Sequence, residues 1–256
     1  MRVGLFIPCY IDQMFPQVGL ATVQVLSRFR HLELDYPEDQ TCCGQPMANT
    51  GCTGDARPLA ERFVENFHDY DHVVCPSGSC VSMVRNHYED YFHNDHRFQR
   101  LKTRVWELCE FLCDVVQVQT MPFSFPHRVG LHSSCHGLRE LRLDACSERV
   151  GPQASKVRRV LELVPEIELV PLQRPDECCG FGGTFAVAEE GVSNMMGHDR
   201  IRDHVGSGAE YITATDSSCL MHLDGLARRA KIHIPTIHVA EILAGMKPDS
   251  AKHPIA

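Results

Sequence analysis

The sequence has no run of about 18 consecutive apolar residues, which is the length that a transmembrane helix needs. It has no Lys/Arg-rich stretch either, and its formal net charge of -8 argues against nucleic acid as the main partner. Residues 1–8 contain a short apolar run without a small-residue cleavage site, so we expect a first strand there and not a signal peptide. These absences predict a globular cytoplasmic protein that neither spans a membrane nor binds nucleic acid.

Two widespread redox motifs are also missing. The run Gly180-Phe181-Gly182-Gly183 lacks the spacing of a dinucleotide-binding fingerprint, so nothing in the sequence indicates NAD. There is no Cys-x-x-Cys-x-x-Cys run of the ferredoxin type. The chain does have 13 cysteines, and without a secretory signal they favour metal or redox chemistry in a reducing compartment over a disulfide framework.

The cysteines follow one pattern that occurs twice. A Cys-Cys-Gly run in the first half of the chain, residues 42–44, returns in the second half as residues 178–180. One cysteine precedes each pair and another follows it, which gives two sets of four: Cys9, Cys42, Cys43 and Cys80, and then Cys135, Cys178, Cys179 and Cys219. A repeat unit of about half the chain predicts two similar domains, each with a thiolate-rich site.

Short β-rich segments alternate with helical ones, which predicts an α/β fold with a small parallel sheet flanked by helices in each half. The predicted strands are residues 2–8, 31–36, 72–74 and 104–106 in the first half, and 128–131, 167–170, 211–214 and 231–234 in the second. Residues 122–127 contain two prolines and suit neither a helix nor a central strand, so we assign them to a linker. The predicted domains are residues 1–121 and 128–256, related by internal duplication.

This topology predicts where the cysteines lie. Each cysteine of the repeated pattern follows a predicted strand. In a parallel sheet all strands point the same way, and ligands bind beyond their carboxyl ends. We therefore expect the four cysteines of each half to converge at the carboxyl edge of their own sheet.

Adjacent cysteines allow three interpretations. Buried structural thiols are the first, but they do not explain a doubled pair that occurs twice. Zinc is the second, although neighbouring residues wrap a single ion poorly; His132 and His136 near Cys135 would permit it, and the first half has no equivalent histidines. An iron–sulfur cluster accepts thiolates from well-separated loops, and we favour this third interpretation.

Local features suit such a cluster. Cys80 and Cys219 lie where helices are predicted to begin, and the helix dipole and free N–H groups stabilise a thiolate there. His132 and His136, on either side of Cys135, could tune a cluster or transfer a proton. Glycines beside the paired cysteines would let the backbone approach the cofactor and donate N–H groups to sulfur. These glycines are Gly44, Gly180, Gly182 and Gly183.

The sequence resembles the cysteine-rich family with paired Cys-Cys-Gly domains, which includes one of the subunits of heterodisulfide reductase and the iron–sulfur subunits of glycolate oxidase. Residues 76–80 and 178–185 carry the most specific part of this resemblance, which extends over nearly the whole chain. The chain is most similar to the short, stand-alone branch of the family, formed by the first subunits of lactate-utilisation complexes.

The resemblance implies an iron–sulfur protein, with a [4Fe-4S] cluster or a non-cubane variant held by the eight repeated cysteines. It implies electron transfer in the NAD-independent oxidation of L-lactate, or a related 2-hydroxy acid, to the 2-oxo acid. It further implies two partners, a ferredoxin-like iron–sulfur subunit and a third subunit of the complex. The sequence names no catalytic base.

One position departs from the family pattern, which ends in Cys-x-x-Cys. The first cysteine of that pair is replaced by Ser77 in the first half and by Asp216 in the second, so each half offers four matching thiolates and the cluster type stays open. Asp216 could ligate metal through oxygen or cap the helix that follows it. Cys75 lies two residues from the vacant place, but we expect it to be a buried strand-end residue.

For the remaining residues we expect structural roles. Cys109 and Cys113 are four apart on a predicted helix and should lie in the core, while Cys52 could be a spare ligand. Glu110 and Glu241 occupy matching places on the last helix of each half, where a surface or subunit-contact role is expected. Two other functions fit the pattern: a zinc-binding or structural scaffold subunit, and a thiol–disulfide reductase that uses a cysteine pair.

Overall fold

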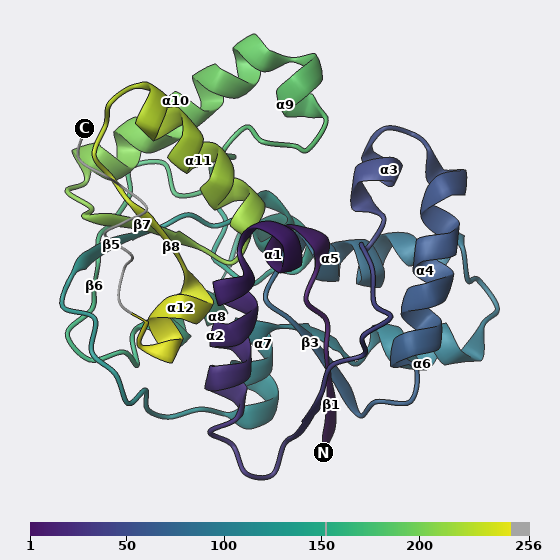
Figure 1. Ribbon diagram of the computed structural model, residues 1–256. Coiled ribbons are helices and arrows are strands. Elements are labelled where there is room, and N and C mark those ends of the chain that lie inside the picture. The colour runs from purple at the N-terminus through teal and green to yellow at the C-terminus, as the bar shows by residue number, and fades with distance from the viewer. Residues whose placement is uncertain (152, 247–256) are drawn as a thin grey trace.

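The computed structural model describes residues 1–151 and 153–246 and has two four-stranded parallel sheets (Figure 1). The first sheet has the strand order β2-β1-β3-β4 and the second the order β6-β5-β7-β8. The strands are β1 (Arg2–Leu5), β2 (Glu33–Asp35), β3 (His72–Cys75), β4 (Val105–Glu107), β5 (Arg128–Leu131), β6 (Glu168–Leu169), β7 (Tyr211–Ala214) and β8 (Thr236–His238). The predicted α/β fold with duplicated halves is confirmed.

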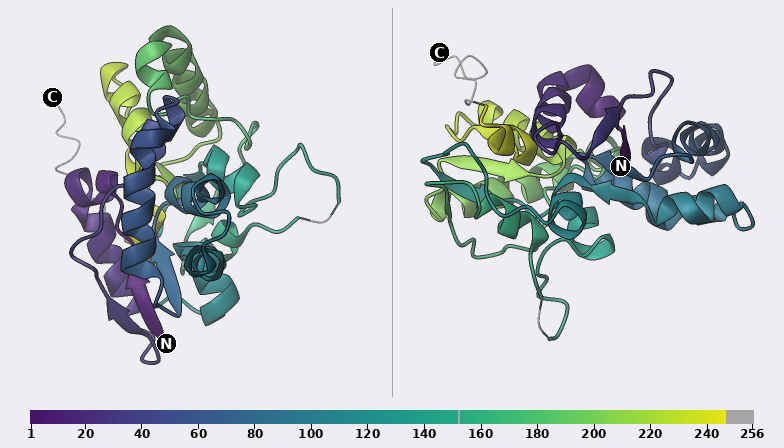
Figure 2. Two further views of the ribbon diagram at one scale, coloured as in Figure 1. Left: turned by 90° about the vertical axis from the view of Figure 1, so that its right-hand side faces the viewer. Right: turned by 90° about the horizontal axis from the view of Figure 1, so that it is seen from below.

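Helices flank both sheets. The first half has α1 (Cys9–Met14), α2 (Pro16–Leu26), α3 (Gln45–Asn49), α4 (Thr53–Phe67), α5 (Gly78–Ser82), α6 (His96–Lys102) and α7 (Leu108–Phe111). It also has the short π-helices η1 (Met83–His87) and η3 (Leu112–Val116) and the 3-10 helix η2 (Tyr88–Asp90). The second half has η4 (His136–Glu140), α8 (Lys156–Leu161), α9 (Phe185–Ala188), α10 (Glu190–Gly206), α11 (Ser217–Arg229) and α12 (Val239–Ala244). The described residues between η4 and α8, 141–151 and 153–155, extend away from the sheets (Figure 2). Within the described residues, no helix is both long and apolar enough to cross a bilayer.

The central strands β1 and β5 have the same sequence, Arg-Val-Gly-Leu, and the same environment. In each strand the arginine is exposed and the next three residues are buried. Gly4 is required because α4 packs closely on β1, and a Cβ at this position would come within 2.9 Å of the Phe67 ring. The repeat therefore extends from the cysteines to the sheet that supports them.

The two halves pack against each other with two-fold pseudosymmetry. In Figure 1, α2 of the first half lies beside α12 of the second, and reciprocally α7 packs on α8. The pairs α5 with η4 and α1 with α11 repeat this relation nearer the carboxyl edges. One hydrophobic core includes side chains of both halves, such as Leu26 and Leu243. Both carboxyl edges are thereby brought to one region.

One predicted strand is wrong. Residues 231–234 alternate like a strand, but β8 begins only at Thr236. Lys231 has a left-handed φ of 57°, and the Ile232 N–H donates to the Ala227 carbonyl over 2.9 Å, so this segment closes the end of α11. Residues 117–127 have no helix or strand, and the division at 122–127 stays a prediction, with residues 247–256 of the second domain outside the described part.

Candidate metal centre

The first cysteine group consists of Cys9, Cys42, Cys43 and Cys80, at the carboxyl ends of β1, β2 and β3. Cys9 begins α1 after β1, and Cys80 lies in α5 after β3. The Sγ atoms of Cys9 and Cys42 are 3.5 Å apart, as are those of Cys43 and Cys80. The structure thus brings the four thiols together at the edge where the topology predicts them.

The second cysteine group consists of Cys135, Cys178, Cys179 and Cys219, which follow β5, β6 and β7. Cys178 is hydrogen-bonded to Cys135 and to Cys179, and Cys179 is hydrogen-bonded to Cys219. These contacts repeat the order found in the first group. The local geometry of the site is therefore duplicated together with the fold.

Both cysteine groups line one pocket between the halves. Tyr10 and Phe181, one from each half, meet in this pocket with ring centroids 6.0 Å apart. The predicted glycines Gly182 and Gly183 also line it. The sequence predicts one site in each half, and it is the packing of the halves that joins the two sites.

The thiols of each group change each other's acidity. In the first group, hydrogen bonds with Cys43 and Cys9 lower the pKa of Cys42. In the second group, hydrogen bonds with Cys135 and Cys179 lower the pKa of Cys178. The hydrogen bond with Cys42, together with burial, raises the pKa of Cys9. In the first group the pKa of Cys80 is lowered as well, by hydrogen bonds with Cys43 and Cys75, whereas in the second group Cys178 alone has a lowered pKa. A bound cation is needed to offset the repulsion of four thiolates in either group.

The glycine after each cysteine pair donates its backbone N–H to sulfur. The Gly44 nitrogen lies 3.4 Å from Cys42 Sγ, and the Gly180 nitrogen lies 3.3 Å from Cys178 Sγ. Both glycines have left-handed φ angles, 82° and 89°, which strain other residues. At Gly180 a Cβ would also come within 2.6 Å of the Ser193 carbonyl oxygen on α10. The loop can therefore take this shape only with glycine.

Asp216 does not cap its own helix, α11, which corrects one of the two expectations for it. Its Oδ1 instead accepts hydrogen bonds across the pseudo-two-fold axis, from Ser77 Oγ over 2.9 Å and from Ser79 N and Oγ over 2.9 and 2.7 Å. Burial would raise the pKa of Asp216, but hydrogen bonds from Ser134, Ser79 and Ser77 hold it below its usual value. The buried Oδ2 accepts none of the hydrogen bonds from Ser77 and Ser79, which leaves it as a candidate metal ligand.

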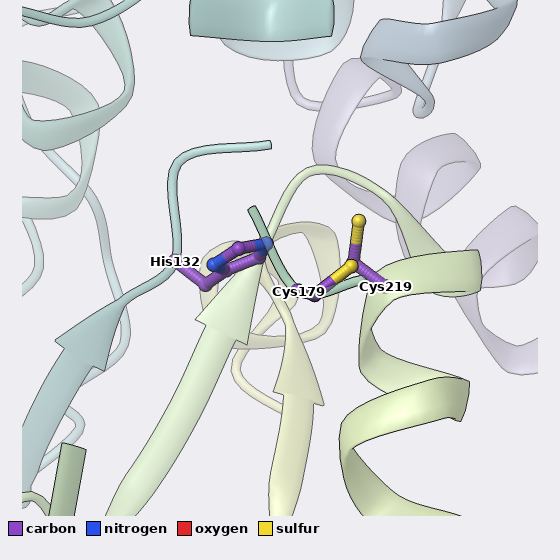
Figure 3. Close-up of side chains that lie close together, drawn as sticks. All are labelled: His132, Cys179 and Cys219. Carbon is purple, nitrogen blue, oxygen red and sulfur yellow. The ribbon is translucent and has the colours of Figure 1, made fainter. Parts of the chain in front are cut away.

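His132 lies beside the second cysteine group, as Figure 3 shows. One of its ring nitrogens and the Sγ atoms of Cys179 and Cys219 all lie within 4.8 Å of one another. The side chain is 1% exposed, and neither ring nitrogen has a hydrogen-bond partner. Burial, and then the charge of Arg200, lower the pKa of His132 to about 4, so the ring is neutral at pH 7. In the sequence, the one indication that His132 belongs to the site is its place three residues before Cys135.

The cysteines outside the repeated pattern do not line the pocket. Cys75, Cys109, Cys113 and Cys146 are buried, and none of them lines the pocket. Cys52 is exposed at the start of α4 and does not line the pocket either. The prediction that Cys109 and Cys113 lie in the core is confirmed.

The surface role expected for Glu110 is wrong. Glu110 is 3% exposed and accepts hydrogen bonds from Arg85 over 2.7 Å and from Lys156 of the second half over 3.1 Å. Its buried carboxylate therefore connects the two halves. Glu241 accepts from the backbone N–H of His238 over 3.0 Å and completes the cap of α12.

Comparison with known proteins identifies the family. The chain matches the family described as "Cysteine-rich domain" (CCG) twice, over residues 3–85 and 129–224. It is 39% identical over 247 residues to "Lactate utilization protein A" of Geobacillus thermodenitrificans (strain NG80-2), covering 95% of this chain and 98% of that protein. It is 35% identical over 248 residues to "Lactate utilization protein A 2" of Bacillus cereus (strain 03BB102), with the same coverage.

A solved structure shares the fold. A hypothetical protein from Helicobacter pylori superposes with a TM-score of 0.66 at 11% sequence identity. The match covers 98% of this chain but 50% of the other. At this identity the likeness shows a common fold alone.

Proposed function

Because the chain belongs to the cysteine-rich domain family, we propose that it is an iron–sulfur subunit that transfers electrons in the oxidation of L-lactate to pyruvate. The observation that carries this proposal is the convergence of two four-cysteine groups on one pocket. The names of the relatives supply lactate as the substrate, and a related 2-hydroxy acid is the alternative. The reaction does not use NAD, and the protein works in the cytoplasm, where thiols stay reduced.

The proposed metal ligands are the eight cysteines of the two groups, with Asp216 Oδ2 as a further candidate. The donor atoms fit an iron–sulfur cluster, since thiolates from separate loops meet within 3.5 Å and backbone N–H groups point at sulfur. A [4Fe-4S] cluster or a non-cubane variant bound here would supply reversible one-electron transfer.

The residues around the cysteines would tune such a cofactor. The N–H groups of Gly44 and Gly180 stabilise negative charge on sulfur. The carboxylate of Asp216 adds negative charge near both groups. Gly182 and Gly183 leave room along the pocket wall. These effects set how readily electrons enter and leave.

We further propose that the protein acts with a ferredoxin-like iron–sulfur subunit and a third subunit. Oxidation of a hydroxy acid removes two electrons and two protons, and the usual hydride acceptors are flavin or nicotinamide. This sequence carries no dinucleotide fingerprint. The names of the relatives, with the letter A, fit one member of a set of proteins.

A zinc-binding subunit is the second candidate function. His132, Cys179 and Cys219 form the donor set of two thiolates and one imidazole that also occurs in catalytic zinc sites. The first group offers thiolates alone. Metal analysis separates the two candidates, because only an iron–sulfur protein carries acid-labile sulfide.

The functional proposal is tested by anaerobic assay of the cluster-loaded protein with L-lactate, with and without the partner subunits. We expect no turnover by the isolated chain and lactate-dependent bleaching of its visible bands when both partners are present. Cys42→Ser and Cys178→Ser should each lower the rate at least tenfold, and Cys52→Ser, outside the pocket, should not. The proposal fails if L-lactate does not reduce the protein either alone or with any of its partner subunits. If the isolated chain turns over L-lactate, the active site lies within this chain.

A further inference from the structure

The two cysteine groups differ at one buried position. Phe6 follows β1 and His132 follows β5, at the same place in the repeat. The Phe6 N–H donates to the Val74 carbonyl over 3.0 Å, and the His132 N–H donates to the Thr213 carbonyl over 2.8 Å. The backbones are thus in the same register, and both side chains are 1% exposed.

Phe6 has a complete structural explanation. Its ring packs edge-on against Phe63, with centroids 4.9 Å apart, and against Phe67 at 5.7 Å. A hydrophobic side chain therefore suffices to fill this place in the fold. The sheet and its packing do not require a histidine.

His132 has no comparable explanation within the protein. Its nearest ring partner is His204, with centroids 6.4 Å apart, and neither nitrogen of His132 makes a hydrogen bond. Burying two unpaired polar atoms costs free energy, so each such group needs a reason. A metal ion held by Cys179 and Cys219 would lie close enough to bind a ring nitrogen of His132.

We propose that His132 is a nitrogen ligand of the metal centre at the second cysteine group, beside Cys179 and Cys219. This rests on the proposed function only in requiring a metal there. Imidazole and thiolate together suit iron and zinc. At one ligand position, imidazole gives an iron–sulfur centre a higher potential than thiolate does. The second centre should therefore have a higher potential in the wild type than in His132→Cys.

The proposal is tested by pulsed EPR of the reduced protein carrying 15N-labelled histidine. We expect one strong nitrogen coupling, of the size found for directly bound imidazole, which disappears in His132→Phe and in His132→Cys. His136→Gln, which changes the other histidine near Cys135, should keep it. In His132→Cys the cluster should persist with a lower midpoint potential, which shows that the variant folds. A weak coupling would mean a hydrogen bond to sulfur and would overturn the proposal.

A second measurement keeps the inference separate from the iron–sulfur proposal. Metal-free protein with Cys42→Ser and Cys43→Ser, which disable the first group, is titrated with Co²⁺ under anaerobic conditions. We expect visible sulfur-to-cobalt bands, and a loss of Co²⁺ affinity of at least about tenfold when His132→Phe is added, since even outer-sphere partners cost that much. Equal affinity would overturn the role of His132, whatever metal the protein holds in the cell.

Discussion

Asp216 connects the two halves through a single carboxylate. Its Oδ1 accepts three hydrogen bonds from Ser77 and Ser79, which begin the opposite helix α5. A buried carboxylate is costly unless it is well paired. The three donors come from the half that does not contain Asp216, so this residue contributes to stability even without metal.

We predict that Asp216→Ala lowers the free energy of unfolding of the metal-free protein by about 1.5–3 kcal/mol or more, because hydrogen bonds to a charged acceptor are lost. Ser77→Ala removes one of the three donors and should cost about 1 kcal/mol. Urea titration under reducing conditions measures both. Equal losses in the two variants would argue against the bridge.

At this scale the sequence predicts residue types better than their surroundings. The eight cysteines stand out because their order repeats, and the structure gathers all of them. His132 and His136 look alike in the sequence, yet His132 is buried and unpaired whereas His136 is partly exposed beside Glu140. Burial and contacts across the pseudo-two-fold axis depend on tertiary packing, which no local pattern encodes.

At the scale of elements, Glu107 caps the last helix of the first half. Its Oε2 accepts from the backbone N–H groups of Cys109 and Glu110 over 2.7 and 3.1 Å. Burial raises the pKa of Glu107 from 4.5 to about 8. His238 occupies the equivalent position before α12 and accepts from Ala240 N through Nδ1 over 3.1 Å.

The Glu107 cap predicts a pH dependence. Between pH 4.5 and 8 the folded state keeps a proton that the unfolded state releases. The stability from this residue is therefore present at low pH and is lost as the pH rises, with a slope of at most about 1.4 kcal/mol per pH unit. In Glu107→Gln, unfolding free energies from pH 5 to 8 should fall less steeply than in the wild type. Parallel curves would contradict this assignment.

The loop between β6 and α9, which contains Gly180, gives a second prediction. Gly180→Ala should destabilise the protein by more than about 1–3 kcal/mol, because the left-handed φ is strained and the new Cβ meets the Ser193 carbonyl. Gly44→Ala shares the strain, but its new Cβ would come no closer than 3.2 Å to any atom of Ala56, so it should cost less. Gly54→Ala, with no atom within 4 Å of its Cβ in α4, should be neutral or stabilising. Thermal melts rank the three, and Gly44→Ala costing more than Gly180→Ala would refute the packing argument.

Element prediction succeeds where the pattern is local. The strands 128–131 and 211–214 are found because short apolar runs are bounded by turns. Helix α10 is missed, since its apolar residues do not form one stripe and Met195 is 69% exposed. The alternating residues 231–234 imitate a strand, but the end of α11 determines their conformation.

At the scale of the molecule, the larger of two hydrophobic core clusters crosses from one half to the other, and the smaller one lies within the second half. The helix pairs α2 with α12 and α7 with α8 bury surfaces that either half alone would expose. The repeat in the sequence indicates two domains but carries no information on how they pack. The pocket shared by the two cysteine groups follows from that packing.

The core cluster shared by the two halves predicts one cooperative unfolding transition for the full chain. The only tryptophan, Trp106, lies in β4 and reports on the first half by fluorescence. Far-UV circular dichroism reports on both halves. Urea midpoints from the two signals should coincide for the metal-free protein. A second transition seen only by circular dichroism would show that the halves unfold independently.

The central claim is that the two cysteine groups bind iron–sulfur, and metal and sulfide analysis of anaerobically purified protein tests it most directly. The account predicts iron and acid-labile sulfide in the wild type. Cys42→Ser should lose the iron and sulfide bound by the first cysteine group, and Cys178→Ser should lose those bound by the second. The control Cys52→Ser should match the wild type. Zinc without sulfide, or iron that neither substitution at the pocket removes, would contradict the account.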